Sequence, residues 1–254
     1  MAKSRSYGYD LEARIAQALR ECGLGEKEIK QVAGKIKTYV EFIGPLKADS
    51  SFWNFRSKLE KVVEAFSDED LTYDEYLQAA LEQPQLFYQS PDTIEFNIRD
   101  LVRRFEPEGL TVKAYLKAAL EQPQLFYRSP DTIEQHIHFV QELEKRGVIK
   151  IPSKYGSVLE WLLANPTYMA YGSDHYRLKF YYAKLLDKPA ALKNLKMPKK
   201  KVISELEQAF GSIHRVEKGK TIIDFEKLHS LYIEKYNKSP AEGAYHAYLW
   251  NENT

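Results

Sequence analysis

An internal repeat constrains the fold of this chain more than any other feature. Residues 71–109 and 110–148 are tandem copies with a period of 39 residues. The segment Tyr76–Glu95 recurs as Tyr115–Glu134 with only two differences. Repeats of this size form supersecondary units that stack on one another, because each unit has an apolar face that it cannot bury alone. The repeat therefore predicts a stack of similar units.

Each copy has the pattern of two helices joined by a bend. In the first copy, Pro84 ends the first helix, because proline lacks the amide hydrogen that a helix interior requires. The triplet Ser90, Pro91 and Asp92 is typical of a helix start. Serine is favoured at the cap position, proline at the first helical position and aspartate in the first turn. Helical spacing predicts one face of the first helix at Tyr73, Leu77, Ala80 and Leu81. It predicts the buried stripe of the second helix at Ile94, Ile98, Leu101, Val102 and Phe105.

Aromatic residues make up 13% of the chain, and the bends hold several of them. Phe87 and Tyr88 lie in the first bend, and Phe126 and Tyr127 lie at the same places in the second. Large rings at such places fill gaps between neighbouring helices. We therefore expect these rings to serve core packing rather than to form a stacking platform for bases.

Two weaker copies extend the repeat on both sides, with Pro45 and Pro166 in the place of Pro84. An N-terminal helical cap is expected over residues 1–31 and a basic C-terminal region over residues 187–254. Four repeats are expected between them, at about 32–70, 71–109, 110–148 and 149–186.

The expected fold class is all-α, a helical-repeat superhelix followed by a small helical region with a short β-hairpin. Hydrophobic periodicity predicts N-terminal helices at about 10–21 and 26–43. Near the C-terminus, a helix is expected between Pro198 and Gly211. Strands at 213–216 and 221–223 would turn at Gly219, and a final long helix would begin near Phe225.

The near-neutral net charge of +1 is a cancellation. Residues 71–148 carry 8 basic and 13 acidic side chains, whereas residues 149–254 carry 17 basic and 11 acidic ones. The excess is steepest at residues 177–220, with 12 basic and 4 acidic side chains. Such asymmetry is typical of a chain with one region that faces a polyanion. The alternative is that these lysines only solvate exposed helices, and the sequence leaves it open.

The proline register resembles the repeat of mitochondrial transcription termination factors, the mTERF family. In that repeat, a proline is followed by large apolar residues at offsets of three, ten and seventeen. Here Pro84 is followed by Phe87, Ile94 and Leu101, and Pro123 by Phe126, Ile133 and Val140. The resemblance implies a helical superhelix that binds double-stranded DNA or RNA along a basic surface and has no enzyme active site. The two best copies are acidic, so any nucleic-acid contact is expected outside them.

The first functional hypothesis is therefore a nucleic acid-binding protein whose contacts lie in the basic C-terminal region. Lysine and arginine side chains there would contact phosphates and release counterions. The candidate residues are Arg177, Lys179, Lys184, Lys188, Lys193, Lys196, Lys199, Lys200, Lys201 and Arg215.

The second hypothesis is a protein-interaction adaptor without nucleic acid binding, which uses the groove of the repeats. Aromatic and arginine side chains dominate the binding energy of protein interfaces. The candidate anchors, expected to be exposed, are Tyr88, Gln89, Tyr127 and Arg128.

Catalytic chemistry has no recognisable motif in this sequence. His136 and His138 are two residues apart on an expected helix, so they point to different faces and cannot chelate a metal together. Cys22 has no recognisable histidine partner, and phosphate-binding glycine loops are absent. We therefore expect no enzyme activity, no cofactor and no metal. With one cysteine, no apolar signal core and no apolar membrane span, an intracellular, cytoplasmic location is expected.

Overall fold

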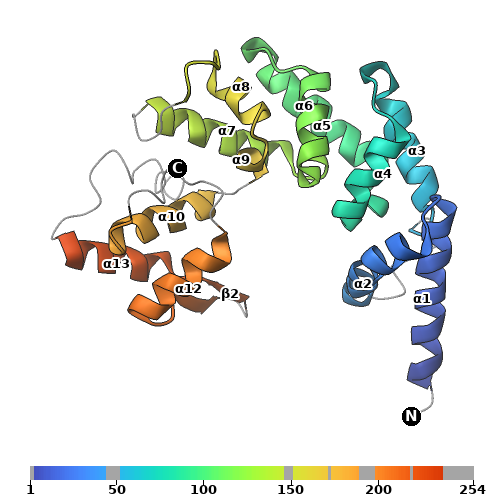
Figure 1. Cartoon of the computed structure of the whole chain (residues 1–254), viewed down its shortest axis with the longest axis horizontal. Coiled ribbons are helices and arrows are strands. Elements are labelled where there is room, and N and C mark those ends of the chain that lie inside the picture. The colour runs from blue at the N-terminus through green and yellow to red at the C-terminus, as the bar shows by residue number, and fades with distance from the viewer. Residues whose placement is uncertain are drawn as a thin grey trace. The chain divides into compact units, whose positions relative to one another are not determined.

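The computed structural model describes residues 3–43, 52–145, 151–170, 173–188, 198–217 and 220–236. Within these ranges the regular secondary structure is helical except for one two-stranded sheet, which confirms the all-α prediction (Figure 1). The chain divides into two compact units, Met1–Ile133 and Glu134–Thr254, here called unit 1 and unit 2. The division falls inside the third repeat, at a place that the repeat pattern does not mark.

Unit 1 is built from consecutive helices, and from α3 onward short 3-10 turns lie between them. The helices predicted at 10–21 and 26–43 are confirmed, and the first begins earlier than expected. The helices are α1 (Lys3–Glu21), α2 (Glu26–Ile43), α3 (Phe55–Ala65), α4 (Tyr73–Glu82), α5 (Pro91–Phe105) and α6 (Val112–Glu121). The 3-10 turns are η1 (Ser67–Glu69), η2 (Pro84–Phe87), η3 (Glu106–Glu108) and η4 (Pro123–Phe126). Helix α7 (Pro130–Lys145) crosses from unit 1 into unit 2.

The two best copies of the repeat fold in the same way. Helices α4 and α6 begin and end at equivalent residues, as do the turns η2 and η4. Thr72 caps α4 in a reciprocal capping box with Glu75, and Thr111 caps α6. Ser90 precedes α5 as predicted, but its side chain makes no capping hydrogen bond. The bend that Pro84 predicts is a 3-10 turn, η2, which begins at the proline itself.

The core of unit 1 runs between consecutive helices. Helix α3 contacts α4 and α5, and α6 contacts α4 and α5 in turn. All five residues of the predicted stripe on α5 are buried. On α4 three residues of the predicted face, Leu77, Ala80 and Leu81, are buried. The fourth, Tyr73, is only half-buried, and Tyr76, which was not predicted, is fully buried.

Phe87 and Phe126 at the bends are fully buried, as the packing prediction requires. Phe126 lies edge-on to Tyr76 of the preceding copy, with ring centroids 5.0 Å apart. Tyr88 stacks on Tyr39 of α2 with ring centroids 4.1 Å apart and on Phe52 at 5.6 Å. These rings join one helical layer to the next.

The duplication offers a matched pair of buried tyrosines. The Tyr115 hydroxyl donates a hydrogen bond of 3.0 Å to the carbonyl oxygen of Leu125, whereas the equivalent Tyr76 hydroxyl is buried without a hydrogen-bond partner. Removing a satisfied buried hydroxyl costs about 1 kcal/mol and leaves the carbonyl unpaired, whereas removing an unsatisfied one is close to neutral. Tyr115→Phe should therefore lower the free energy of unfolding by about 1 kcal/mol relative to Tyr76→Phe in urea denaturation. Equal losses in the two variants would contradict this.

Unit 2 has a helical core and one β-hairpin. The elements are α8 (Val158–Leu163), α9 (Thr167–Ala170), α10 (Ser173–Leu185), α12 (Lys199–Phe210), β1 (His214–Glu217), β2 (Lys220–Ile223) and α13 (Phe225–Tyr236). The predicted C-terminal helices and hairpin are thus confirmed. The strands pair antiparallel with His214 opposite Ile223. The predicted turn residue Gly219 lies outside the described residues.

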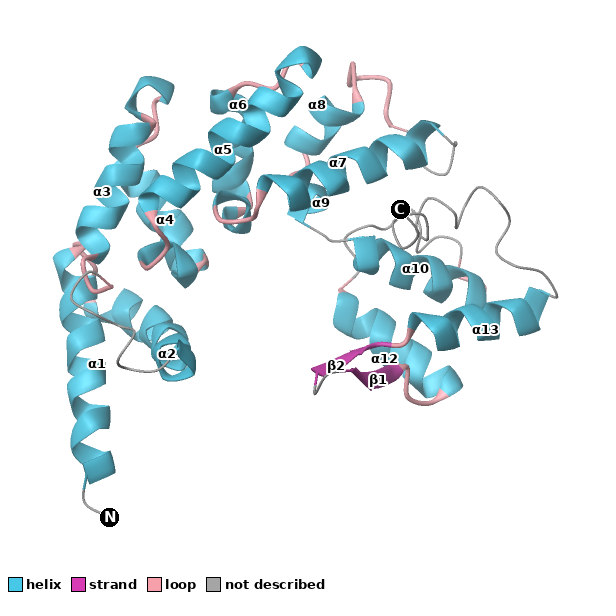
Figure 2. Ribbon diagram, turned by 180° about the vertical axis from the view of Figure 1, so that it is seen from behind, coloured by secondary structure: helices cyan, strands magenta, loops and turns pink. Residues whose placement is uncertain are grey.

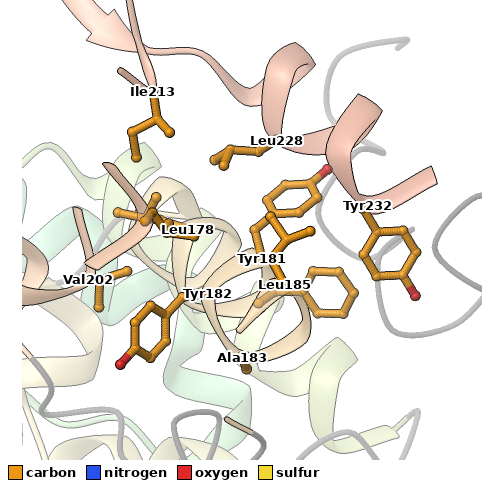
Figure 3. Packing of buried hydrophobic residues seen from close by; sticks show 11 residues of the cluster. Leu178, Tyr181, Tyr182, Ala183, Leu185, Val202, Ile213, Leu228 and Tyr232 are labelled. Atoms are coloured by element: carbon orange, nitrogen blue, oxygen red, sulfur yellow. The ribbon is translucent and has the colours of Figure 1, made fainter. Parts of the chain in front are cut away.

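The core of unit 2 joins α10, α12, α13 and the hairpin. Helix α10 contacts both α12 and α13. In Figure 3, Val202 of α12 and Leu228 of α13 lie on different sides of the α10 residues Leu178 and Tyr181. Tyr182 of α10 and Ile213, just before β1, belong to the same buried cluster. This packing fixes which face of α12 points away from the core.

Candidate nucleic-acid interface

Helix α12 presents a polar face to solvent. Val202 and Leu206 point into the core, and Ile203 and Phe210 pack against it. Helical geometry places residues 200, 201, 204 and 208 on the side opposite Val202 and Leu206. The side chains there are exposed, and we call them the outer face of α12: Lys200, Lys201, Ser204 and Gln208.

Both acidic residues of α12 lie at the flanks of the outer face and are held by partners. Glu205 accepts hydrogen bonds from the Lys188 ammonium and from the Tyr182 hydroxyl, the latter at 2.6 Å. The contact with Lys188 lowers the pKa of Glu205, so this carboxylate stays ionised and paired. On the other flank, Glu207 lies 2.8 Å from Nδ1 of His214. The negative charges of the helix are thus engaged by other residues of unit 2.

Three exposed lysines begin α12: Lys199, Lys200 and Lys201 (the lysine cluster). The first turn has no acidic residue, and Pro198 at the cap position gives no side-chain hydrogen bond. Lys201 lies 3.9 Å from Glu205. Among the described residues, Lys199 and Lys200 form no ion pair. The first turn therefore combines several positive charges with a helix N-terminus that no side chain caps.

The β-hairpin lies beside α12 (Figure 2). Arg215 of β1 is half-buried and pairs with Glu226 of α13 at 2.8 Å, so part of its charge is used within the unit. Val216 is 75% exposed and faces Thr221, which is also exposed. The hairpin thus places an exposed surface next to the end of α12.

The remaining basic candidates differ in how far they are exposed, and some lie outside the described residues. Lys188 is exposed but pairs with Glu205, and Lys184 is half-buried. The carbonyl oxygen of Lys184 accepts hydrogen bonds from Tyr236 at 2.6 Å and Lys235 at 3.2 Å, so this part of α10 holds α13. The side chain of Arg177 and all of Lys193 and Lys196 lie outside the part of the chain that the structure describes.

The prediction that Lys179 contacts phosphate is wrong. Its side chain is only 1% exposed, in the core region around α10, so it does not offer a phosphate contact. Burial lowers the pKa of this lysine to about 8, because desolvation disfavours the charged form. Helix α10 is apolar on several sides, and Lys179 packs within it. The density of basic residues in the sequence does not distinguish such a buried lysine from an exposed one.

The four proposed protein anchors are not exposed as expected. Tyr88, Gln89, Tyr127 and Arg128 are all half-buried. Tyr127 accepts a hydrogen bond of 3.0 Å from Gln83, and the Arg128 guanidinium donates one of 3.0 Å to Gln124. Together with the stacking of Tyr88 on Tyr39, these contacts hold the bends of unit 1 together.

Sequence reasoning missed Ser204 and Gln208, although a signal for them exists. The apolar positions Val202, Ile203, Leu206 and Phe210 identify the buried side of α12. The opposite side of the helix is the outer face, where Ser204 and Gln208 lie one and two turns beyond Lys200. An open depression of about 440 Å³ adjoins this face, and its lining residues are Leu186, Lys188, Glu205, Gln208 and Ala209.

Other kinds of site find no support within the described ranges. No group of three or more His, Cys, Asp and Glu side chains there is arranged to hold a metal ion. Cys22 is buried, and burial raises the pKa of its thiol to about 12, which disfavours the reactive thiolate. Among the described helices, none combines the length and the apolar character needed to cross a bilayer.

The outer face of α12 and the lysine cluster are thus the surface with the clearest chemistry, a positively charged helix end beside neutral polar groups. Comparison with known proteins adds no relative: no family model, no curated protein and no solved structure matches the chain significantly.

Proposed function

We propose that this protein binds nucleic acid without catalysis, through the basic surface of unit 2. The observation that carries the proposal is the lysine cluster, whose three side chains are exposed at one helix end. The surrounding segment, residues 177–220, has 12 basic and 4 acidic side chains. A local excess of this size attracts the phosphates of DNA or RNA.

The position of the lysine cluster strengthens this proposal. The N-terminal end of a helix carries a partial positive charge and favours acidic side chains. Helix α4 follows this rule with Asp74 and Glu75, whereas α12 begins with Lys199–Lys201. Repulsion between these lysines and the helix end is relieved when an anion binds there, and phosphate is an anion that backbone N–H groups bind well.

The repeats of unit 1 are proposed to form the mTERF-like superhelix that their register resembles, in the role of a scaffold. Their helix ends are unsuited to phosphate. Asp131 in the first turn of α7 pairs at 2.7 Å with Arg104, which also pairs at 2.6 Å with buried Asp100. These charges join α5 to the start of α7. A carboxylate at the helix end repels a phosphate at the same place.

The test is the salt dependence of binding. If the lysine cluster neutralises three phosphates, log K should fall with log salt with a slope of about −2.7 for a DNA duplex. Affinity should then drop about 40-fold between 50 and 200 mM salt. Fluorescence anisotropy with labelled duplex DNA, duplex RNA and single strands measures both quantities. Absence of binding to every one of these probes at 50 mM salt would contradict the proposal.

A further inference from the structure

We infer that α12 is a reading helix, which enters the major groove of double-stranded DNA and contacts base edges through Ser204 and Gln208. The inference rests on the proposed function and adds to it the nucleic-acid class and the residues that give sequence preference. Three features support it: the composition of the outer face of α12, the pairing of the acidic residues at its flanks, and the neighbouring hairpin.

Along the outer face of α12, positively charged residues come first and uncharged polar residues follow. The lysine cluster occupies the first turn, where it can hold phosphates at the edge of a groove. Ser204 and Gln208 follow on the same side, and both are exposed, uncharged and able to donate and accept hydrogen bonds. Glutamine pairs in a bidentate manner with adenine in the major groove, and serine bonds to several bases.

The flanking carboxylates do not oppose this docking. A glutamate that points freely outward from α12 would repel the phosphates on either side of the groove. Glu205 is instead turned to Lys188 and Tyr182, and Glu207 to His214. The side of the helix that leads away from the core therefore presents positive and neutral groups.

The hairpin is suitably placed to contact the flanking backbone. Its first residue, His214, touches Glu207 near the C-terminal end of α12. The sequence His214–Ile223 contains three basic residues and one acidic residue. A helix inserted in a groove brings neighbouring elements close to the phosphates that border it. The hairpin would thus border the duplex, and its sequence has an excess of basic residues.

Groove dimensions favour DNA over RNA. The major groove of B-DNA is about 12 Å wide and admits an α-helix, whose diameter with side chains is about 10–12 Å. The major groove of an RNA duplex is deep and too narrow for side chains to read. At 12 residues, α12 is about 18 Å long, which is enough to carry the lysine cluster to one strand while Ser204 and Gln208 lie over the bases.

The experiment is a selection of preferred duplexes from a randomised DNA library with the full chain, followed by binding measurements. The quantity measured is the discrimination ratio, the affinity for the selected duplex divided by that for a scrambled one. For Ser204→Ala/Gln208→Ala, we expect this ratio to fall about tenfold or more, while the affinity for the scrambled duplex stays within about twofold. Gln31→Ala/Gln78→Ala, which removes two exposed glutamines of unit 1, is the matched control and should keep the ratio of the wild type.

The outcomes separate this inference from the proposed function. If the library yields no preferred sequence, if Ser204→Ala/Gln208→Ala keeps the full discrimination ratio, or if duplex RNA is bound as tightly as the selected DNA, the inference is overturned while salt-dependent binding stands. If the chain binds no nucleic acid at low salt, the proposed function fails as well. Both substituted side chains are exposed, so the double variant should keep its helical fold. Circular dichroism checks this.

Discussion

Replacing Phe87 with alanine should lower the free energy of unfolding of unit 1 by about 3–5 kcal/mol. Phe87 is 0% exposed, and its ring lies 5.7 Å from that of Phe55 in α3. The turn η2, which ends at Phe87, also contacts α2 and α4. Truncation would therefore leave a cavity where three helices meet, and the loss of packing adds to the loss of apolar burial.

Phe96→Ala is the matched control for this prediction. Phe96 lies in α5, nine residues further along the chain, and is 66% exposed. Its truncation removes the same atoms from a solvated position and should change stability by about 0.5 kcal/mol or less. Native-state hydrogen exchange read on peptides from α3 to α5 reports unit 1 separately from unit 2. Similar exchange in the Phe87 and Phe96 variants would show that the bend is not part of the core.

The sequence predicts the repeat well because local signals and packing agree there. Pro84 and Pro123 fix the bends, and the stripe from Ile94 to Phe105 needs only helical periodicity. On α4 the sequence missed Tyr76, because buried alanine and leucine residues around it make the helix apolar on more than one side. Which of those sides faces the neighbouring copy depends on how the copies pack, and periodicity does not specify that.

The candidate site was predicted only in part. The lysine cluster follows from composition, since three adjacent lysines after a proline are seldom all buried. Lys179 and Lys199 look alike in the sequence, yet one is in the core and the other in solvent. The pairing of Glu205 with Lys188 joins α12 to the turn after α10, 17 positions earlier in the sequence, so it depends on how α12 packs against α10.

Reversing the lysine cluster with Lys199→Glu/Lys200→Glu/Lys201→Glu should weaken duplex binding at least about 100-fold at 100 mM salt. Each exposed contact with a phosphate contributes up to about 1 kcal/mol, and reversal replaces attraction with repulsion of similar size. The variant should remain folded, because acidic side chains are favoured in the first turn of a helix. Loss of binding with retained helicity would therefore report on the surface itself.

A control with the same change in net charge distinguishes a local interface from a general effect of charge. Lys27→Glu/Lys30→Glu/Lys35→Glu reverses three exposed lysines of α2 in unit 1. Both triple variants change the formal charge of the chain by the same amount, so long-range steering by net charge changes similarly in each. Only a local contact predicts a large difference between them.

The affinity of these two variants and of the wild type for one labelled DNA duplex, measured over a range of salt concentrations, is the most direct test of binding through unit 2. The prediction is that the α2 variant stays within about fivefold of the wild type with a similar slope, while the α12 variant loses at least about 100-fold and most of the slope. Equal affinities of the two variants, or a larger loss in the α2 variant, would contradict the proposal that the lysine cluster of α12 forms the interface.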